Sequence, residues 1–214
     1  MALSKVNYNS LNVTPTASKF LMWDSDADAL QASDVGGSLK LLSTQTASSS
    51  STLDFTSGID STYKEYIFKF INIHPASNNT ELTFNMSVDG GSNYNVAKTT
   101  TFFQAEHDEA DSTTSLGYKT GDDLAQGTGF QNLCDTIGND NDASGNGFLH
   151  LFDPSNTTFV KHFISTVNGM YNSNYITNCF AAGYGNTTSA VNAVQFKMSS
   201  GNIDSGVIKM YGVS

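Results

Sequence analysis

The sequence contains no arginine, and its ten basic residues are all lysines. Asp and Glu together number 20, which gives a formal net charge of −10. Charged residues make up only 14% of the chain, well below the roughly 25% of an ordinary soluble domain. Proteins that bind nucleic acid neutralise its phosphates with Lys and Arg. We therefore expect no nucleic acid among the partners of this protein.

Long apolar segments are also missing. No apolar run approaches the roughly 18 residues of a transmembrane helix, so we expect no membrane contact. The first residues, MALSKVNYNSLNVTP, lack the apolar core of a secretory signal peptide, and we expect none. Wholesale disorder does not fit either, because 38% of the residues are hydrophobic and 11% are aromatic.

Cysteine is scarce, and its two copies, Cys134 and Cys179, form neither a CxxC motif nor a metal-ligand spacing. We interpret both as small, partly buried thiols in a reducing compartment, and a disulfide between them stays an alternative. The histidines likewise share no ligand spacing. The four are His74, His107, His150 and His162. His150 and His162 fall within expected strands, and we interpret them as hydrogen-bonded residues on a strand face rather than as zinc ligands.

What the sequence does contain, from Leu39 onward, is the apolar–polar alternation of β-strands. About ten such segments follow one another, with turn residues every eight to fifteen positions and no convincing helical stretch. We predict an all-β domain over residues 39–214, an antiparallel, jelly-roll-like β-sandwich. Glycine-rich turns at 89–92 and 199–202 predict hairpins, and the polar segment 106–129 is predicted to be a long loop.

Residues 1–38 differ from this pattern and are predicted to form an extended N-terminal arm. The arm is polar apart from Phe20, Leu21, Met22 and Trp23, and it cannot bury enough surface to fold alone. Chain ends are ordered only where something ties them down. We therefore expect the arm to dock on its own domain or on a neighbouring subunit, with these four side chains as anchoring residues.

Patterns for enzymatic chemistry are weak. The densest acidic cluster is Glu106–Asp111, and Asp122 and Asp123 close the same segment. Glycoside hydrolysis needs two carboxyl groups flanking a sugar, whereas loop acids are solvated by default. There is no Gly-x-Ser-x-Gly nucleophile motif. We assign no catalytic residue and no cofactor, and we expect the protein not to be an enzyme.

Asp140–Gly145 matches the first half of a calcium-binding loop, with oxygen-bearing side chains at its positions one, three and five. Position twelve is Leu151 where such a loop needs a bidentate Glu, and no helix flanks it, so an EF-hand is excluded. A looser calcium site stays open, and no metal ligand is assigned. Tyrosines or Trp23 could also stack on a sugar ring, which leaves carbohydrate binding open.

Several segments resemble structural proteins encoded by tailed bacteriophages. They are LLSTQTAS at 41–48, FTSGIDSTYKEY at 55–66, FINIHP at 70–75 and SGNIDSGVIKMYGV at 200–213. In the arm, SKFLMWD at 18–24 and DVGG at 34–37 are similar to short modules near the start of phage fibre and decoration proteins. The resemblance covers most of the chain, but such β-sandwiches occur on heads, tails and fibres alike.

The resemblance implies a non-enzymatic protein of the virion surface, assembled in the host cytoplasm. Its first implication is a capsid decoration (cement) protein anchored by the arm. A tail-fibre or head-fibre tip that recognises a host surface glycan is the alternative, and a glycan depolymerase is the third. Implied partners are other virion proteins, namely the major capsid protein or a tail or fibre adaptor. Further copies of the chain are also implied, as a homo-oligomer and specifically a trimer. No catalytic residue comes with the resemblance.

Overall fold

The computed structural model describes residues 20–23, 26, 30–33, 38–171 and 174–214. All regular secondary structure in these residues is β-strand, and the strands pair antiparallel throughout. The prediction of an all-β, antiparallel fold is therefore confirmed. The chain divides into two units, Met1–Ser38 and Leu39–Ser214.

In the first unit, strand β1 (Phe20–Trp23) pairs with β2 (Leu30–Ser33). Phe20 lies opposite Ser33 and Trp23 lies opposite Leu30. The described part of the arm is thus a short hairpin, and two strands alone are marginally stable in water. The predicted docking of the arm also involves residues 1–19, which lie outside the described residues.

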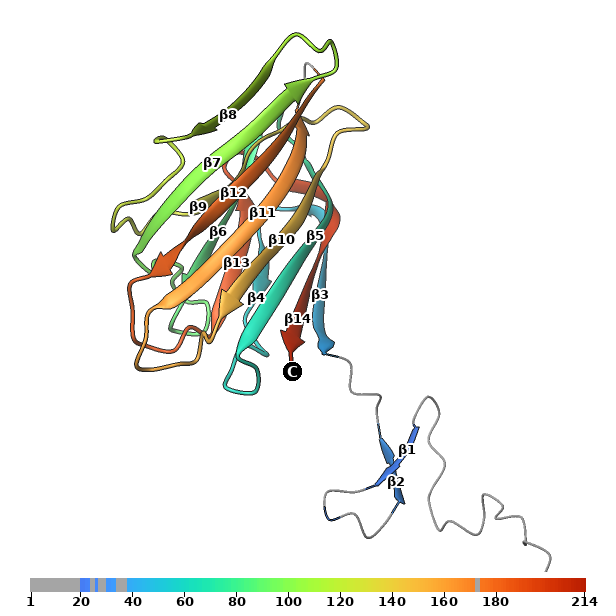
Figure 1. The fold of residues 1–214 in the computed structure, drawn as a ribbon, viewed down its shortest axis with the longest axis vertical. Coiled ribbons are helices and arrows are strands. Elements are labelled where there is room, and N and C mark those ends of the chain that lie inside the picture. The colour runs from blue at the N-terminus through green and yellow to red at the C-terminus, as the bar shows by residue number, and fades with distance from the viewer. Residues whose placement is uncertain (1–19, 24–25, 27–29, 34–37, 172–173) are drawn as a thin grey trace, which may run out of the picture. The chain divides into compact units, whose positions relative to one another are not determined.

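The second unit is a β-sandwich, and Figure 1 shows its smaller sheet behind its larger one. The four-stranded sheet has the order β4 (Leu53–Phe55), β13 (Ala193–Met198), β6 (Thr80–Ser87), β9 (Gln131–Ile137). The order of the eight-stranded sheet is β3 (Leu39–Ser50), β14 (Ile203–Val213), β5 (Glu65–Pro75), β10 (Gly145–Phe152), β11 (Lys161–Tyr171), β12 (Tyr175–Gly185), β7 (Lys98–Asp108), β8 (Thr114–Tyr118).

Each connection from β3 to β7 crosses from one sheet to the other. This interlacing gives the sandwich its jelly-roll-like character. It also makes the two predicted hairpins wrong, because β6 and β7 belong to different sheets, as do β13 and β14. The turns themselves form as expected, since Gly90, Gly91 and Gly201 have φ values of 73°, 91° and 72°. Turn residues mark where the chain reverses but do not specify which sheet the next strand enters.

The described sandwich has twelve strands, β3 to β14, against about ten expected. Strand β8 lies inside the segment 106–129, which was predicted to be a loop, and β7 continues into the same segment as far as Asp108. All five residues of β8 are exposed, so the strand carries no buried face that alternation could reveal.

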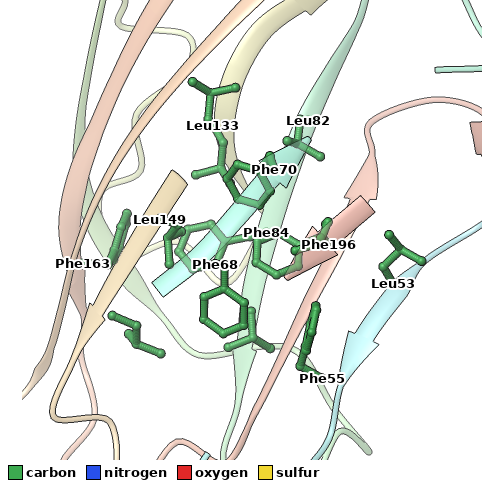
Figure 2. Close-up of a cluster of buried hydrophobic side chains, with 14 of the residues drawn as sticks. Leu53, Phe55, Phe68, Phe70, Leu82, Phe84, Leu133, Leu149, Phe163 and Phe196 are labelled. Carbon is green, nitrogen blue, oxygen red and sulfur yellow. The ribbon is translucent and has the colours of Figure 1, made fainter. Parts of the chain in front are cut away.

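The core is formed by the inward-facing residues of both sheets, and Figure 2 shows its aromatic centre. Phe196 of β13 lies in the middle, with ring centroids 5.2 Å from Phe68 and 5.2 Å from Phe70 of β5. Phe55 of β4 also contacts Phe196, and its ring centroid lies 6.0 Å away. Such aromatic pairs contribute about 0.5–1.5 kcal/mol each beyond the burial of their area. The contacts join the two sheets into one core.

Candidate functional site

The four predicted anchoring residues are all exposed in the hairpin. Phe20, Leu21, Met22 and Trp23 retain 59%, 42%, 47% and 62% of their surface accessible to solvent. A strand points alternate side chains to opposite faces, so both faces of β1 present apolar groups. Contiguous exposed apolar side chains mark sites of interaction. The hairpin is therefore the first candidate functional surface.

The second candidate surface is the outer face of the eight-stranded sheet. Its strands alternate between buried and exposed side chains: Phe102, Leu149 and Phe163 are fully buried or nearly so and face the core. Their strand neighbours face outward and form rows across the sheet. One row runs through Leu41, Tyr211, Ile67, His150, Ile164, Ala182 and Thr101.

A second outward row runs beside the first through Tyr118, Phe103, Phe180, Thr166, Phe148, Lys69 and Lys209. Phe103 and Phe180 stack with ring centroids 4.8 Å apart and an angle of 11° between the rings. Large apolar side chains stay exposed in both rows, for example Phe148 at 39% and Ile164 at 51%. Neither row contains an acidic residue, although the whole chain has a net charge of −10.

A pocket of about 430 Å³ opens on this outer face, over β7, β11 and β12. The rings of His162 and Tyr184 form part of its lining, with centroids 5.9 Å apart and an interplanar angle of 52°. Both side chains combine an apolar ring with a polar tip. The other outward-facing lining residues are Thr99, Thr101, Phe152, Ile164 and Ala182. The pocket can thus accept a ligand that has both an apolar face and hydroxyl groups.

Three of the four histidines have an oxygen partner in the described structure. His150 contacts the Glu65 carboxylate through its Nδ1, which confirms its interpretation as a hydrogen-bonded residue on a strand face. His107 Nε2 lies 3.1 Å from an Asp111 carboxylate oxygen, and His74 Nε2 lies 3.2 Å from the Asp140 carbonyl oxygen. Across the described residues, no group of three or more His, Cys, Asp or Glu side chains has an arrangement that could hold a metal ion.

The acidic candidates in the segment 106–111 have structural partners. Asp108 accepts hydrogen bonds from the backbone N–H groups of Ser112 and Thr113, at 2.9 and 2.8 Å. A further bond from the Ser112 hydroxyl is the largest cause that lowers the pKa of Asp108. Glu106 accepts from the Ser115 hydroxyl at 2.6 Å. Asp108 thus holds the turn between β7 and β8.

Glu106 does share one pocket, of about 340 Å³, with a second carboxylate, that of Asp135. Lys119 also lines this pocket, so its lining contains one basic side chain as well as the two acidic ones. Asp108 lines a different pocket, of about 190 Å³, together with His107 and Glu109. The acids that stand out in the sequence therefore do not converge on one groove.

The calcium-like segment 140–145 connects β9 to β10. Its Gly145 is a strand residue rather than a loop hinge, and a side chain there would meet Ile137 Cδ1 at 2.6 Å. The Asp140 carbonyl oxygen accepts a hydrogen bond from the Ala143 N–H at 2.9 Å, which closes a tight turn. The segment thus serves as the entry to a packed strand.

Cys134 of β9 and Cys179 of β12 are free and buried between the two sheets. Their thiols are neighbours, and the hydrogen bond between them, together with burial, raises the pKa of Cys134 well above its usual value. The Cys179 thiol also accepts a hydrogen bond from the Asp135 N–H at 3.4 Å. Both residues act as small core side chains that link the layers.

Comparisons with protein-family models, with curated proteins and with solved structures find no match to this chain. Among the described residues there is no helix with the length and hydropathy needed to span a bilayer.

Proposed function

We propose that this chain is a non-enzymatic structural protein of the surface of a tailed-bacteriophage particle. In this proposal it acts as a capsid decoration protein, with the sandwich displayed and the N-terminal arm anchored to the major capsid protein or to another virion protein. The observation that carries the proposal is the exposed apolar strand β1, which lies in a unit separate from the sandwich. When a partner covers four consecutive exposed apolar side chains, their apolar area leaves water, and this lowers the free energy of binding.

The two outward rows of the large sheet support self-association, and we propose a homotrimer. Copies with a net charge of −10 repel one another, but these rows contain lysines, aromatics and aliphatic residues and no acid. The carboxylates nearest the rows are each held by a row residue, Glu65 by His150 and Asp123 by Tyr118. In a trimer each copy would present different parts of this face to its two neighbours, with less repulsion than the net charge of −10 implies. Sedimentation equilibrium should give three times the chain mass, and Ile164→Asp should reduce it to the single-chain value. Asn168→Asp, which adds the same charge to the same exposed face of β11 but outside the two rows, is the matched control.

The anchoring role is tested with capsids from which the protein has been stripped. We expect a chain carrying Phe20→Ser and Trp23→Ser to lose capsid binding, because both exposed anchors lose their apolar area. Leu116→Ser and Phe159→Ser form the control, since these side chains are even more exposed, at 73% and 68%, but belong to the sandwich. Binding of the hairpin variant at wild-type affinity contradicts the anchoring role.

A fibre tip that recognises a host surface glycan is the second candidate, and the pocket with His162 and Tyr184 favours it. Under this function, a glycan array gives specific binding, which Tyr184→Ala abolishes and Phe159→Ala leaves unchanged. Antibody labelling of whole particles distinguishes a decoration protein, found over the head, from a tail-fibre tip, found at the tail end. A head-fibre tip would also be labelled at the head, and the glycan array distinguishes it from a decoration protein. Labelling at neither place contradicts both functions.

A further inference from the structure

Lys98 is a lysine without access to solvent. It is the first residue of β7, and its side chain points inward like those of Thr100, Phe102 and Gln104. Its exposed fraction is 0%. The Nζ atom donates hydrogen bonds to the Asn85 side-chain oxygen at 2.6 Å and to the Val96 carbonyl oxygen at 2.8 Å. Both acceptors are neutral. Burial lowers the pKa of Lys98 to about 7, so a large share of the amine is unprotonated and nucleophilic at neutral pH.

The carboxamide of Asn85 is held in one orientation by groups on all sides. Its Nδ2 donates to the carbonyl oxygens of Tyr94 at 2.7 Å, Thr128 at 3.0 Å and Gly129 at 3.4 Å. Its Oδ1 accepts from the backbone N–H of Met86 at 2.8 Å as well as from Lys98. A flipped amide would place its NH₂ group against two donors, so the carbonyl oxygen faces the lysine.

These contacts supply what an acyl-transfer reaction needs: a donor for the developing negative charge, a positioned leaving group and the exclusion of water. The Met86 N–H is placed to stabilise negative charge that develops on Oδ1 when a nucleophile adds to Cγ. The three carbonyl oxygens around Nδ2 accept hydrogen bonds from it and fix its position; they supply no proton, so the one proton that Nδ2 needs to leave as ammonia comes from Nζ. Asn85 and Lys98 are both fully buried, so water does not compete as nucleophile. The 2.6 Å contact between Nζ and Oδ1 holds the amine against the carboxamide before any reaction.

We propose that Lys98 and Asn85 join in an intramolecular isopeptide bond. The neutral Nζ adds to Cγ of Asn85 and a new Nζ–Cγ amide bond forms. The Cγ–Nδ2 bond breaks, one proton passes from Nζ to Nδ2, and the nitrogen leaves as ammonia. The step is an aminolysis in which nothing is oxidised or reduced. Because Asn85 lies in β6 and Lys98 in β7, the bond connects the four-stranded sheet covalently to the eight-stranded sheet.

Lys161 of β11 provides an internal comparison. It is also fully buried, and Gly185 of β12 lies opposite both lysines in the strand register. Its Nζ donates only to main-chain carbonyl oxygens, among them that of Phe159 at 2.6 Å. No side-chain carboxamide is within its hydrogen-bonding set. We therefore expect Lys161 to stay a free amine, although its side chain is as inaccessible to solvent as that of Lys98.

The test is the intact mass of the purified, natively folded full chain, followed by tryptic mapping after denaturation. We expect a mass below that of the sequence by one ammonia, and no tryptic cleavage after Lys98. Fragmentation of the peptide that spans residues 70–119 should place the link between Asn85 and Lys98. Cleavage after Lys161 should be complete in the same digest. Asn85→Ala and Lys98→Met should each restore the full mass.

Measurements on the unmodified protein decide the question even if both variants fail to fold. A full sequence mass, with cleavage after Lys98 as complete as after Lys161, overturns the proposal. A mass deficit that maps to a succinimide at an asparagine overturns it too, since a succinimide loses the same ammonia but leaves Lys98 cleavable.

Discussion

Phe102 and Phe103 are neighbours in β7, yet they lie on opposite faces of the eight-stranded sheet. Phe102 is fully buried against the core, whereas Phe103 is 42% exposed and stacks on Phe180 in an outward row. The inner face contains polar groups as well, including Lys98 and Lys161. Hydrophobicity alone therefore does not distinguish the two faces. The difference is that the four-stranded sheet covers the inner face and leaves the outer face open. Burial of the inner face stabilises the fold, whereas the apolar area of the outer face stays available for contact.

Replacing each phenylalanine in turn gives the largest expected effect. Phe102→Ala removes a buried ring and should lower the free energy of unfolding by about 3–5 kcal/mol. Phe103→Ala removes a half-exposed ring and one stacking contact, so it should cost about 1 kcal/mol. Urea denaturation of both variants measures the difference. Equal losses would show that the outer face contributes to the fold as much as the inner one.

The buried Lys98 should make stability depend on pH in a way that an exposed lysine does not. In the Asn85→Ala variant, which cannot form the isopeptide bond, Lys98 keeps its burial. The folded state then releases the lysine proton near pH 7, whereas the unfolded chain holds it up to about 10.5. The unfolded state binds more protons between these values, so stability should rise as pH increases from 7 to 10.

One pKa unit corresponds to about 1.4 kcal/mol, so the whole rise should amount to a few kcal/mol, measured by urea denaturation at several pH values. Adding Lys98→Met to the same variant should remove this rise, while other titrating groups stay the same. An unchanged pH profile in the double variant would mean that Lys98 is protonated in the folded protein.

The glycines give the smallest effect. A side chain at Gly185 on the inner face would meet Met86 Cε at 2.7 Å and Val96 Cγ1 at 2.9 Å. Gly185→Ala should therefore cost about 1–3 kcal/mol through overpacking, towards the lower end because the end of Met86 can move. Gly117 in β8 has nothing within 4 Å of the added carbon, so Gly117→Ala should leave the thermal midpoint nearly unchanged. A large loss at Gly117 would indicate that β8 is covered.

Alternation of apolar and polar residues predicted most strands of the sandwich, because in strands such as β7 and β11 buried and outward-facing residues alternate. It missed β8, whose residues are all exposed. It also assigned wrong neighbours to β6 and β13, since pairing across two layers depends on contacts between residues distant in the sequence. These are tertiary effects that turn residues do not encode.

The candidate surfaces were predicted unevenly. Four consecutive apolar residues in a polar arm were sufficient to identify Phe20–Trp23. The outward rows could be identified only from the structure, because they depend on which residues of neighbouring strands lie opposite each other. Lys98 was missed because a lysine is usually exposed. The sequence did contain one signal. Lys98 and Phe102 are four residues apart in one strand, so their side chains lie on the same face, and Phe102 is an expected core residue. The partners of its amine, Asn85 and Val96, could come only from the structure.

Leu39 and Val213 are paired opposite each other in β3 and β14, and Figure 1 shows Ser214 beside the start of β3. The sandwich therefore begins and ends at one corner. Domains with adjacent termini tolerate insertion into the loop of another protein. The residues from Leu39 to Ser214 could be grafted between two loop residues of a carrier with little strain, and a cargo fused after Ser214 would emerge beside the attachment of the arm.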